Sequence, residues 1–159
     1  MHYTLTHQRA GSWPEEKAVD TLTLDFDARH HRRIRLTTDK GEDVLLYLPN
    51  AVAMADGDGL QLEDGRWIAV RAAAEVIVEI SHDDPERLVS IAWHLGNRHV
   101  QTDVRRRVLH IRPDHVIEDM LEGLGAQVRT VQATFQPEAG AYVRSDQQHS
   151  RGDGLHDHD

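Results

Sequence analysis

Histidine is unusually frequent in this sequence, and two histidines stand close together in the segment AWHLGNRHV. Twelve of the 159 residues are histidine, and none is cysteine. Imidazole is the commonest protein ligand for borderline transition metals such as nickel, copper and zinc. His94 and His99 are separated by a spacing that does not place them on one stripe of a helix, so the pair is not expected to chelate one ion.

His99 is the more promising metal ligand of the two. His94 lies beside the apolar face of the helix predicted before it, where a histidine commonly serves packing. His99 follows the predicted end of that helix, at a junction where a side chain can project from the surface. One imidazole holds a metal weakly, but a twofold dimer presents the same residue twice beside its axis. A homodimer is therefore the simplest route to a two-nitrogen site.

Further histidines stand in two later segments. LHIRPDHV contains His110 and His115, and the C-terminal stretch contains His149, His156 and His158. His115 is predicted in the first turn of a helix, where the helix dipole favours the neutral imidazole that binds metals; a plain surface histidine is the alternative. The ending HDHD suits loose ion binding, with an inert tail or a purification remnant as the alternative.

Composition and missing motifs exclude several classes of protein. The net charge is 18 − 27 = −9, which argues against nucleic acid as a partner because phosphate binding needs a basic face. Without cysteine there is no disulfide framework, zinc ribbon or thiol nucleophile. No His-Glu-x-x-His, Gly-x-Ser-x-Gly or phosphate-loop motif occurs, so catalysis is not predicted. With no signal peptide and no long apolar stretch, a cytoplasmic protein without membrane contact is expected.

The first 72 residues have a β pattern. Residues 21–26 alternate apolar and polar side chains, and further strands are expected in residues 32–38 and 43–49. Apolar residues on both sides of the turn at residues 63–65 predict a hairpin. Short strands with glycine-rich turns favour a small barrel or sandwich.

The pattern changes near residue 73, where an apolar strand, AAEVIVEI, precedes a segment with helical spacing. Pro85 suits a first helical turn, Ser81 is a candidate cap, and Gly96 is the expected left-handed stop. Asp83 and Asp84 suit the positive end of the helix dipole. The apolar face of this helix consists of Leu88, Ala92 and Leu95.

Two short strands, a second helix and a last strand complete the predicted domain. VQTDV and RRVLHIRP are expected to pair, and VRTVQATFQP is the last strand. Asp114 is the expected cap of the second helix and Gly125 its stop. The apolar face predicted for that helix contains Val116, Met120, Leu121 and Leu124. The order βαββαβ is that of the ferredoxin-like fold.

The predicted fold class is therefore α+β, in three parts. Residues 1–72 form an all-β domain, and residues 73–143 form a ferredoxin-like domain that binds metal and dimerises. Residues 144–159 are rich in Gly, Asp, Gln and His, a composition that cannot offset the entropy of ordering. A flexible, histidine-bearing tail is expected there.

Three segments, WHLGNRHV, DHVIEDML and FQPEAGAY, occur in this order ahead of the predicted tail. With them the chain closely resembles, over essentially its whole length, the urease accessory protein E family, the nickel metallochaperones of urease maturation. The resemblance implies an N-terminal domain that contacts partner proteins, a metal-binding ferredoxin-like domain, and a homodimer. It also implies a protein that is not an enzyme and that carries Ni(II) as cargo to the urease apoprotein complex, together with other accessory proteins including a GTPase.

The resemblance also implies which histidines bind nickel. The histidine that closes Gly-Asn-Arg-His, here His99, is the central ligand and faces its symmetry mate in the dimer. In some relatives the histidine at the position of His115 forms a secondary site with a histidine two residues earlier. That position is Pro113 here, so His110 from the neighbouring strand is the candidate substitute. Imidazole coordination, partly from the tail, suits binding followed by release, and Zn(II) and Cu(II) are expected to compete.

Three other functions fit parts of the sequence. Some small ferredoxin-like proteins hydrolyse acyl phosphates with an Arg and an Asn, the roles imaginable for Arg98 and Asn97, but a phosphate-cradling loop is missing. A general metal buffer or zinc sensor would use the histidines, although it needs no β domain for docking. An RNA-binding domain is disfavoured by the charge of −9 and the aromatic content of 5%.

Overall fold

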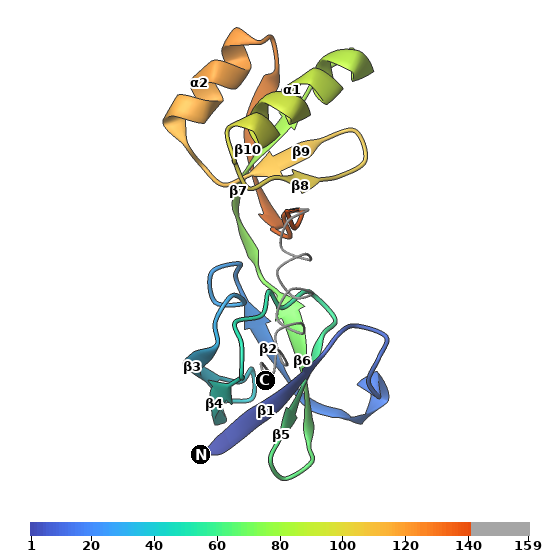
Figure 1. The fold of residues 1–159 in the computed structure, drawn as a ribbon, viewed down its shortest axis with the longest axis vertical. Helices are drawn as coiled ribbons and strands as arrows, with labels where there is room; N and C mark the ends of the chain where they lie inside the picture. The colour runs from blue at the N-terminus through green and yellow to red at the C-terminus, as the bar shows by residue number, and fades with distance from the viewer. Residues whose placement is uncertain (141–159) are drawn as a thin grey trace, which may run out of the picture.

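The computed structural model describes residues 1–140 of the chain, and these form two domains joined end to end (Figure 1). The tail histidines His149, His156 and His158 lie outside the described residues. The N-terminal domain consists of β1 (His2–Gln8), the 3-10 helix η1 (Glu15–Lys17), β2 (Ala18–Leu24), β3 (Arg33–Thr37), β4 (Asp43–Tyr47), β5 (Gly59–Leu62) and β6 (Trp67–Ala72). The C-terminal domain consists of β7 (Ala74–Ser81), α1 (Pro85–Asn97), β8 (Asp103–Val104), β9 (Leu109–Ile111), α2 (His115–Gly123) and β10 (Gln127–Thr134).

The N-terminal domain is one curled six-stranded sheet in the order β2-β6-β5-β1-β4-β3. Neighbouring strands are antiparallel except for the pairs β1–β4 and β2–β6, which are parallel. Apolar side chains from alternate strand positions fill its core, among them Leu22, Leu46, Leu60 and Ile68. The predicted β class and the hairpin of β5 and β6 are confirmed.

Some details of this domain differ from the sequence prediction. A single sheet stands where a small barrel or sandwich was expected. Strand β2 begins at Ala18 and ends at Leu24, so Phe26 lies beyond it and packs between the domains. Strand β1 was not predicted because Thr4 is its one buried residue. Its place in the sheet depends on pairing with β4 and β5, which are distant in sequence.

The C-terminal domain confirms the ferredoxin-like prediction. Its strands lie in the order β10-β7-β9-β8 with every neighbouring pair antiparallel. Both helices pack on one face of this sheet through an apolar core that contains Val78, Ile80, Ile91, Leu95, Leu109, Ile111, Ile117 and Leu121. Because the chain alternates direction, the end of α1 and the start of α2 lie at the same end of the sheet, the end where β7 begins (Figure 1).

Helix α1 starts and stops at other residues than predicted. Its cap is Asp84, whose Oδ1 accepts the Glu86 N–H at 3.0 Å, and Pro85 is its first residue. The prediction of Ser81 as the cap was wrong, because Ser81 is the last residue of β7. The prediction of a left-handed stop at Gly96 was also wrong. Gly96 stays helical, and the backbone becomes left-handed at His99, with φ of 57°.

Helix α2 follows its predicted boundaries more closely. Asp114 caps it by accepting the N–H groups of the next turn, and Gly125 follows its end with φ of 85°. The predicted apolar face was wrong in part, because Val116 is 72% exposed and Ile117 is buried in its place. Within residues 1–140, neither helix is long and apolar enough to cross a membrane.

The two domains meet in a small apolar cluster. Phe26 from the N-terminal domain packs against Ile77 and Phe135 from the C-terminal domain, and its ring lies edge-on to that of Phe135 at 5.3 Å. The Phe26 N–H donates to the carboxylate of Glu75 at 2.9 Å. Arg29 bridges the same junction by donating to the carbonyl oxygens of Met54 and Phe135. These contacts place the N-terminal domain beneath the end of the ferredoxin-like sheet that carries His99.

Candidate metal centre

His99 occupies the position just past the C-terminal cap of α1. Its N–H donates to the Gly96 carbonyl at 3.1 Å, and the N–H of Val100 donates to the Leu95 carbonyl at 3.0 Å. This pair of hydrogen bonds is the Schellman motif, in which the residue after the cap adopts a left-handed conformation. Val100 packs on the core that contains Leu95, so burial of Val100 holds the turn in place. The side chain of His99 is left exposed at the surface.

Helix α2 ends in the same motif, but with the usual residue. There Gly125 donates to the Glu122 carbonyl at 2.9 Å and Ala126 donates to the Leu121 carbonyl at 3.0 Å. Glycine is preferred at this position because other L-residues cost about 1–2 kcal/mol in the left-handed region. His99 adopts this unfavourable conformation although its ring forms no hydrogen bond with any other described residue. Such unfavourable backbone conformations are concentrated at functional sites.

His115 lies at the same end of the domain as His99. It is the first residue of α2 and is exposed. Asp114 orders the turn around it, because its Oδ1 accepts the Val116 N–H at 3.0 Å and the Ile117 N–H at 3.2 Å. His99 and His115 are thus two surface imidazoles, one at the negative end of a helix and one at the positive end of another.

His110 is placed differently from the other two predicted ligands. It is only 3% exposed, and its Nε2 lies 3.0 Å from Glu79 Oε2. Its Nδ1 has no hydrogen-bond partner. The His110 hydrogen bond, followed by the one from Arg129, lowers the pKa of Glu79. If the ionised Glu79 accepts the Nε2 proton, Nδ1 keeps a free lone pair. This is the arrangement of metal-binding histidines, but burial separates it from the exposed pair.

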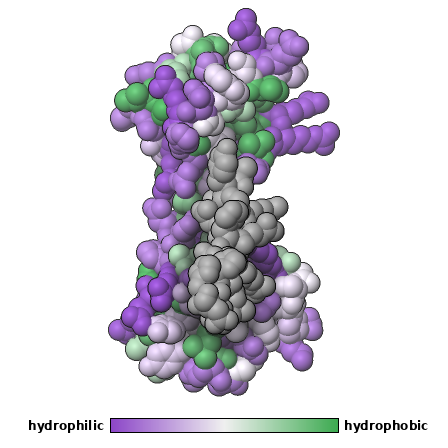
Figure 2. All heavy atoms as spheres, viewed as in Figure 1, coloured by the Kyte–Doolittle hydropathy of each residue, from purple (hydrophilic) through white to green (hydrophobic). Residues whose placement is uncertain are grey.

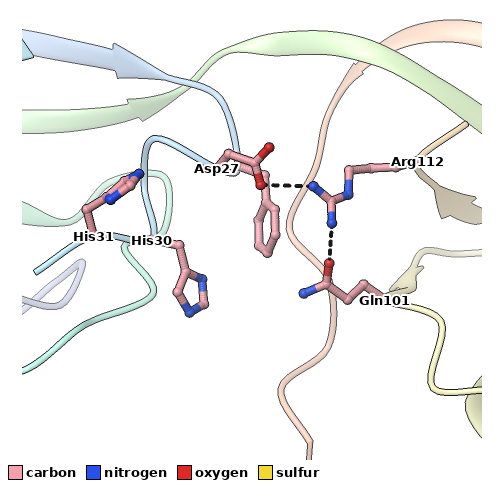
Figure 3. Close-up of a pocket in the computed structure, with 6 residues that line it drawn as sticks. Asp27, His30, His31, Gln101 and Arg112 are labelled. Carbon is pink, nitrogen blue, oxygen red and sulfur yellow. Dashed lines mark hydrogen bonds and ion pairs between the residues drawn. The ribbon is translucent and has the colours of Figure 1, made fainter.

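A cleft of about 430 Å³ lies between the two domains (Figure 3). Two of its lining residues are close in sequence to the predicted ligands, since Gln101 follows His99 by two residues and Arg112 precedes His115 by three. Arg112 spans it, with 2.9 Å from Nη1 to Asp27 Oδ1 and 2.6 Å from Nη2 to Gln101 Oε1. His30 and His31 line the N-terminal side. The sequence interpretation missed these two histidines, although their adjacency was a visible signal.

Within residues 1–140, no group of three or more His, Asp or Glu side chains converges in a way that would hold a metal ion. The structure places His99 and His115 at one end of the domain, leaves His110 inside it, and does not describe His149, His156 and His158. The described part of the chain therefore presents exposed imidazoles that are not gathered into one cluster of ligands.

The fold and these histidines define a class: a two-domain protein in which a β-rich domain is joined to a ferredoxin-like domain with exposed imidazoles. The profile of the UreE urease accessory protein, N-terminal domain, matches residues 3–73, and that of the UreE urease accessory protein, C-terminal domain, matches residues 75–159. The chain belongs to the UreE urease accessory protein family. The resemblance found in the three sequence segments is confirmed.

Individual relatives support this membership. Urease accessory protein UreE of Rhodopseudomonas palustris strain BisB18 is 53% identical over 128 residues, which cover 80% of this chain and 61% of that protein. The UreE of Bradyrhizobium sp. strain ORS 278 is 51% identical over 135 residues, 85% of this chain and 64% of that protein. The UreE of Chelativorans sp. strain BNC1 is 48% identical over 145 residues, 90% and 92% of the two chains. The chain thus spans less than two thirds of the first two relatives and most of the third.

Proposed function

We propose that this protein is a nickel metallochaperone of urease maturation. It binds Ni(II) as cargo between the His99 side chains of a homodimer and delivers it, in the cytoplasm, to the urease apoprotein complex with other accessory proteins, including a GTPase. The observation that carries the proposal is the exposed imidazole held at a left-handed position where glycine is preferred. The names of the relatives, all urease accessory proteins, support urease as the destination.

The remaining histidines have supporting roles in this proposal. His115 and the tail residues His149, His156 and His158 add donors around the central pair, and His110 is the inner candidate for a secondary site. Imidazole sites of this kind also bind Zn(II) and Cu(II), with Cu(II) ahead of Ni(II) in intrinsic affinity. Selectivity then depends on metal availability and on docking to the partner proteins.

The direct test is activation of urease apoprotein in a defined mixture of accessory proteins and limiting nickel. Activation is expected to rise when the nickel-loaded chain is added and to fall when it is left out. An equal amount of nickel carried by free histidine is the control. If free histidine activates urease equally well, the protein is a metal buffer and not a delivery protein.

The position of Asn97 and Arg98 argues against the acyl phosphate hydrolase alternative. Asn97 is the last residue of α1 and Arg98 is its C-terminal cap. The C-terminus of a helix carries partial negative charge, which disfavours a bound phosphate. An acyl phosphate assay is therefore expected to show no turnover above the rate in buffer.

An apolar strip on α1 supports the proposed dimer. Val89 and Trp93 are one turn apart on the side opposite the buried Ile91 and Leu95, and they are 70% and 64% exposed. Figure 2 shows hydrophobic surface on the domain that contains the two helices. Exposed apolar patches mark interaction sites, and this strip leads along α1 toward His99. A twofold contact through it would bring two copies of α1, and with them the two His99 residues, together.

Replacement of Trp93 by aspartate is therefore expected to convert the dimer to a monomer. Light scattering after gel filtration should give twice the chain mass of 18.1 kDa for the native protein and the single chain mass for the variant. Val19→Asp, at an exposed apolar position of the N-terminal domain, is the matched control and should remain dimeric. A native protein that is monomeric with and without nickel would contradict the shared site.

Nickel affinity is expected to fall as pH falls from about 7.5 to about 5.5. An imidazole must be neutral to bind a metal ion, and the pKa of free histidine is about 6.5. Protonation over this range weakens binding about 10-fold for each ligand histidine and about 100-fold for a pair. Competition titrations with a metal indicator, repeated at each pH, measure how the nickel affinity changes with pH. A flat profile would mean that carboxylates hold the ion.

A further inference from the structure

The outer face of the N-terminal sheet carries exposed apolar side chains on two neighbouring strands. On β1, Tyr3 is 46% exposed and Leu5 is 51% exposed, and on β4, Tyr47 is 41% exposed. Their chain neighbours Thr4 and Leu46 are buried in the core. Successive side chains of a strand point to opposite faces of the sheet, so the exposed ones share the outer face. A solvated sheet face normally carries polar side chains, and this one does not.

The pairing of the strands places these apolar side chains side by side. Strands β1, β4 and β3 are neighbours at one end of the sheet order (Figure 1). In the parallel pair of β1 and β4, Tyr3 lies opposite Leu45. Leu5 and Tyr47 each follow two residues later on their strands, which brings them together as well. The four side chains therefore form one continuous apolar patch.

Two arginines border this patch on the edge strand β3. Arg35 lies opposite Leu45 and Arg33 lies opposite Tyr47, and the Arg33 guanidinium is 4.4 Å from the centre of the Tyr47 ring. Arg35 pairs with Asp43, whereas Arg33 forms no ion pair with any residue between 1 and 140. Tyrosine and arginine are enriched at the energetic centres of protein interfaces. We call the following six residues the tyrosine–arginine face: Tyr3, Leu5, Leu45, Tyr47, Arg33 and Arg35.

The charge of the chain restricts what this face can bind. An anionic membrane and a nucleic acid extend well beyond the two arginines, and the net charge of −9 on the whole chain repels them. A protein segment with a few carboxylates is affected differently, because salt screens exposed charges that are more than about 8–10 Å apart. Such a segment is attracted by the nearby arginines and is screened from the distant acidic residues.

A second copy of this chain is also a poor fit to the face. In a twofold contact, each copy has to supply from the same surface the groups that the other copy needs. Within strands β1, β3 and β4, Asp43 is the only acidic residue, and it already pairs with Arg35. The carboxylates that would match the two arginines therefore have to come from a different protein.

We propose that the tyrosine–arginine face is a docking surface for a partner protein that presents carboxylates beside exposed apolar side chains. The apolar side chains of the partner pack on the two tyrosines and two leucines, and its carboxylates pair with Arg33 and Arg35. Arginine suits this contact because its guanidinium can donate two parallel hydrogen bonds to one carboxylate. The inference rests on the proposed function for the identity of the partner, a protein of urease maturation.

The test measures how tightly the nickel-free chain binds two purified probes, the accessory GTPase and the urease apoprotein complex, by biolayer interferometry. Tyr47→Ala and Arg33→Glu are each expected to weaken binding to at least one probe about tenfold. Higher salt should weaken binding of the native chain. It should have a smaller effect on Arg33→Glu, because that variant has lost the attraction that salt screens.

Two matched variants elsewhere on the same domain are the controls. Arg71→Glu reverses an exposed charge on β6, and Val19→Ala shortens an exposed apolar side chain on β2. Strands β5, β1 and β4 separate β6 from β3 in the sheet, so neither control touches the face. Both controls should bind the probes within about twofold of the native chain. Far-UV circular dichroism on all four variants checks that each is folded.

Nickel calorimetry distinguishes failure of this inference from failure of the proposed function. Tyr47→Ala and Arg33→Glu should bind nickel as the native chain does, because both residues lie in the domain that lacks His99. If the native chain binds no nickel while the two variants still lose partner binding, the proposed function fails and the docking surface stands.

Three results would overturn the inference. The native chain could bind neither probe, or all four variants could bind the probes alike. In the third, vesicles of phosphatidylcholine and phosphatidylserine would capture the native chain but not Tyr47→Ala, which would make the face a membrane contact.

Discussion

Replacement of His99 by glycine is expected to abolish the tightest nickel site and urease activation, while raising the free energy of unfolding by about 0.5–1 kcal/mol. The imidazole is exposed and has no hydrogen bond to another described residue, so its loss removes little packing. Glycine adopts the left-handed conformation of residue 99, with φ of 57°, at no steric cost. Nickel calorimetry, urea denaturation and the activation assay on one variant measure the three effects.

The expected combination of higher stability and lost function is specific to a ligand held in a strained conformation. His99→Ala should lose nickel to the same extent without the gain in stability, because alanine keeps the left-handed penalty. Gly125→Ala provides the matched control at the end of α2. Its added Cβ would meet an ordinary contact of 3.6 Å to His82, so the expected loss of about 1 kcal/mol reports the backbone cost alone. If His99→Gly retains the tight site, the ligand assignment is wrong.

Replacement of Arg29 by methionine is expected to lower the free energy of unfolding by about 3 kcal/mol or more. Arg29 is 2% exposed, and its guanidinium donates to Met54 O at 3.0 Å and to Phe135 O across the domain junction. Burial lowers the pKa of Arg29, while the carboxylates of Glu75, Asp56, Asp25 and Asp58 oppose that shift. Methionine fills much of the volume but leaves two buried carbonyl oxygens without donors. A buried acceptor that loses its donor costs the full desolvation penalty of that group, which is more than the net contribution of an ordinary hydrogen bond.

The same substitution should loosen the connection between the domains. Scanning calorimetry is expected to show one unfolding transition for the native protein and two for Arg29→Met, because the guanidinium links loops of one domain to the end of β10 in the other. Arg35→Ala removes a surface ion pair with Asp43, in which Arg35 is 65% exposed, and should change stability by less than about 1 kcal/mol. If Arg29→Met unfolds in a single transition and its free energy of unfolding falls by less than about 1 kcal/mol, the apolar cluster alone joins the domains.

Local signals in the sequence were sufficient for most of the C-terminal domain. Pro85, Asp114 and Gly125 act through the backbone within one turn of a helix, so their roles are readable without knowledge of the fold. The apolar periodicity predicted each strand and helix, and their order predicted the ferredoxin-like plan. His99 was also recognisable as a candidate ligand, because it closes a segment characteristic of the family.

Tertiary structure decided the features that depend on partners distant in sequence. Strand β1 exists because β4 and β5 flank it, although its own side chains give almost no apolar pattern. The left-handed residue is His99 and not Gly96, because Val100 has to reach the core beside Leu95, and that burial outweighs the preference for glycine. Arg29 and Asp103 look like ordinary surface residues in the sequence. They are buried only because two domains meet at Phe135 and the chain beyond it returns to β8, and long-range packing of this kind leaves no local signal.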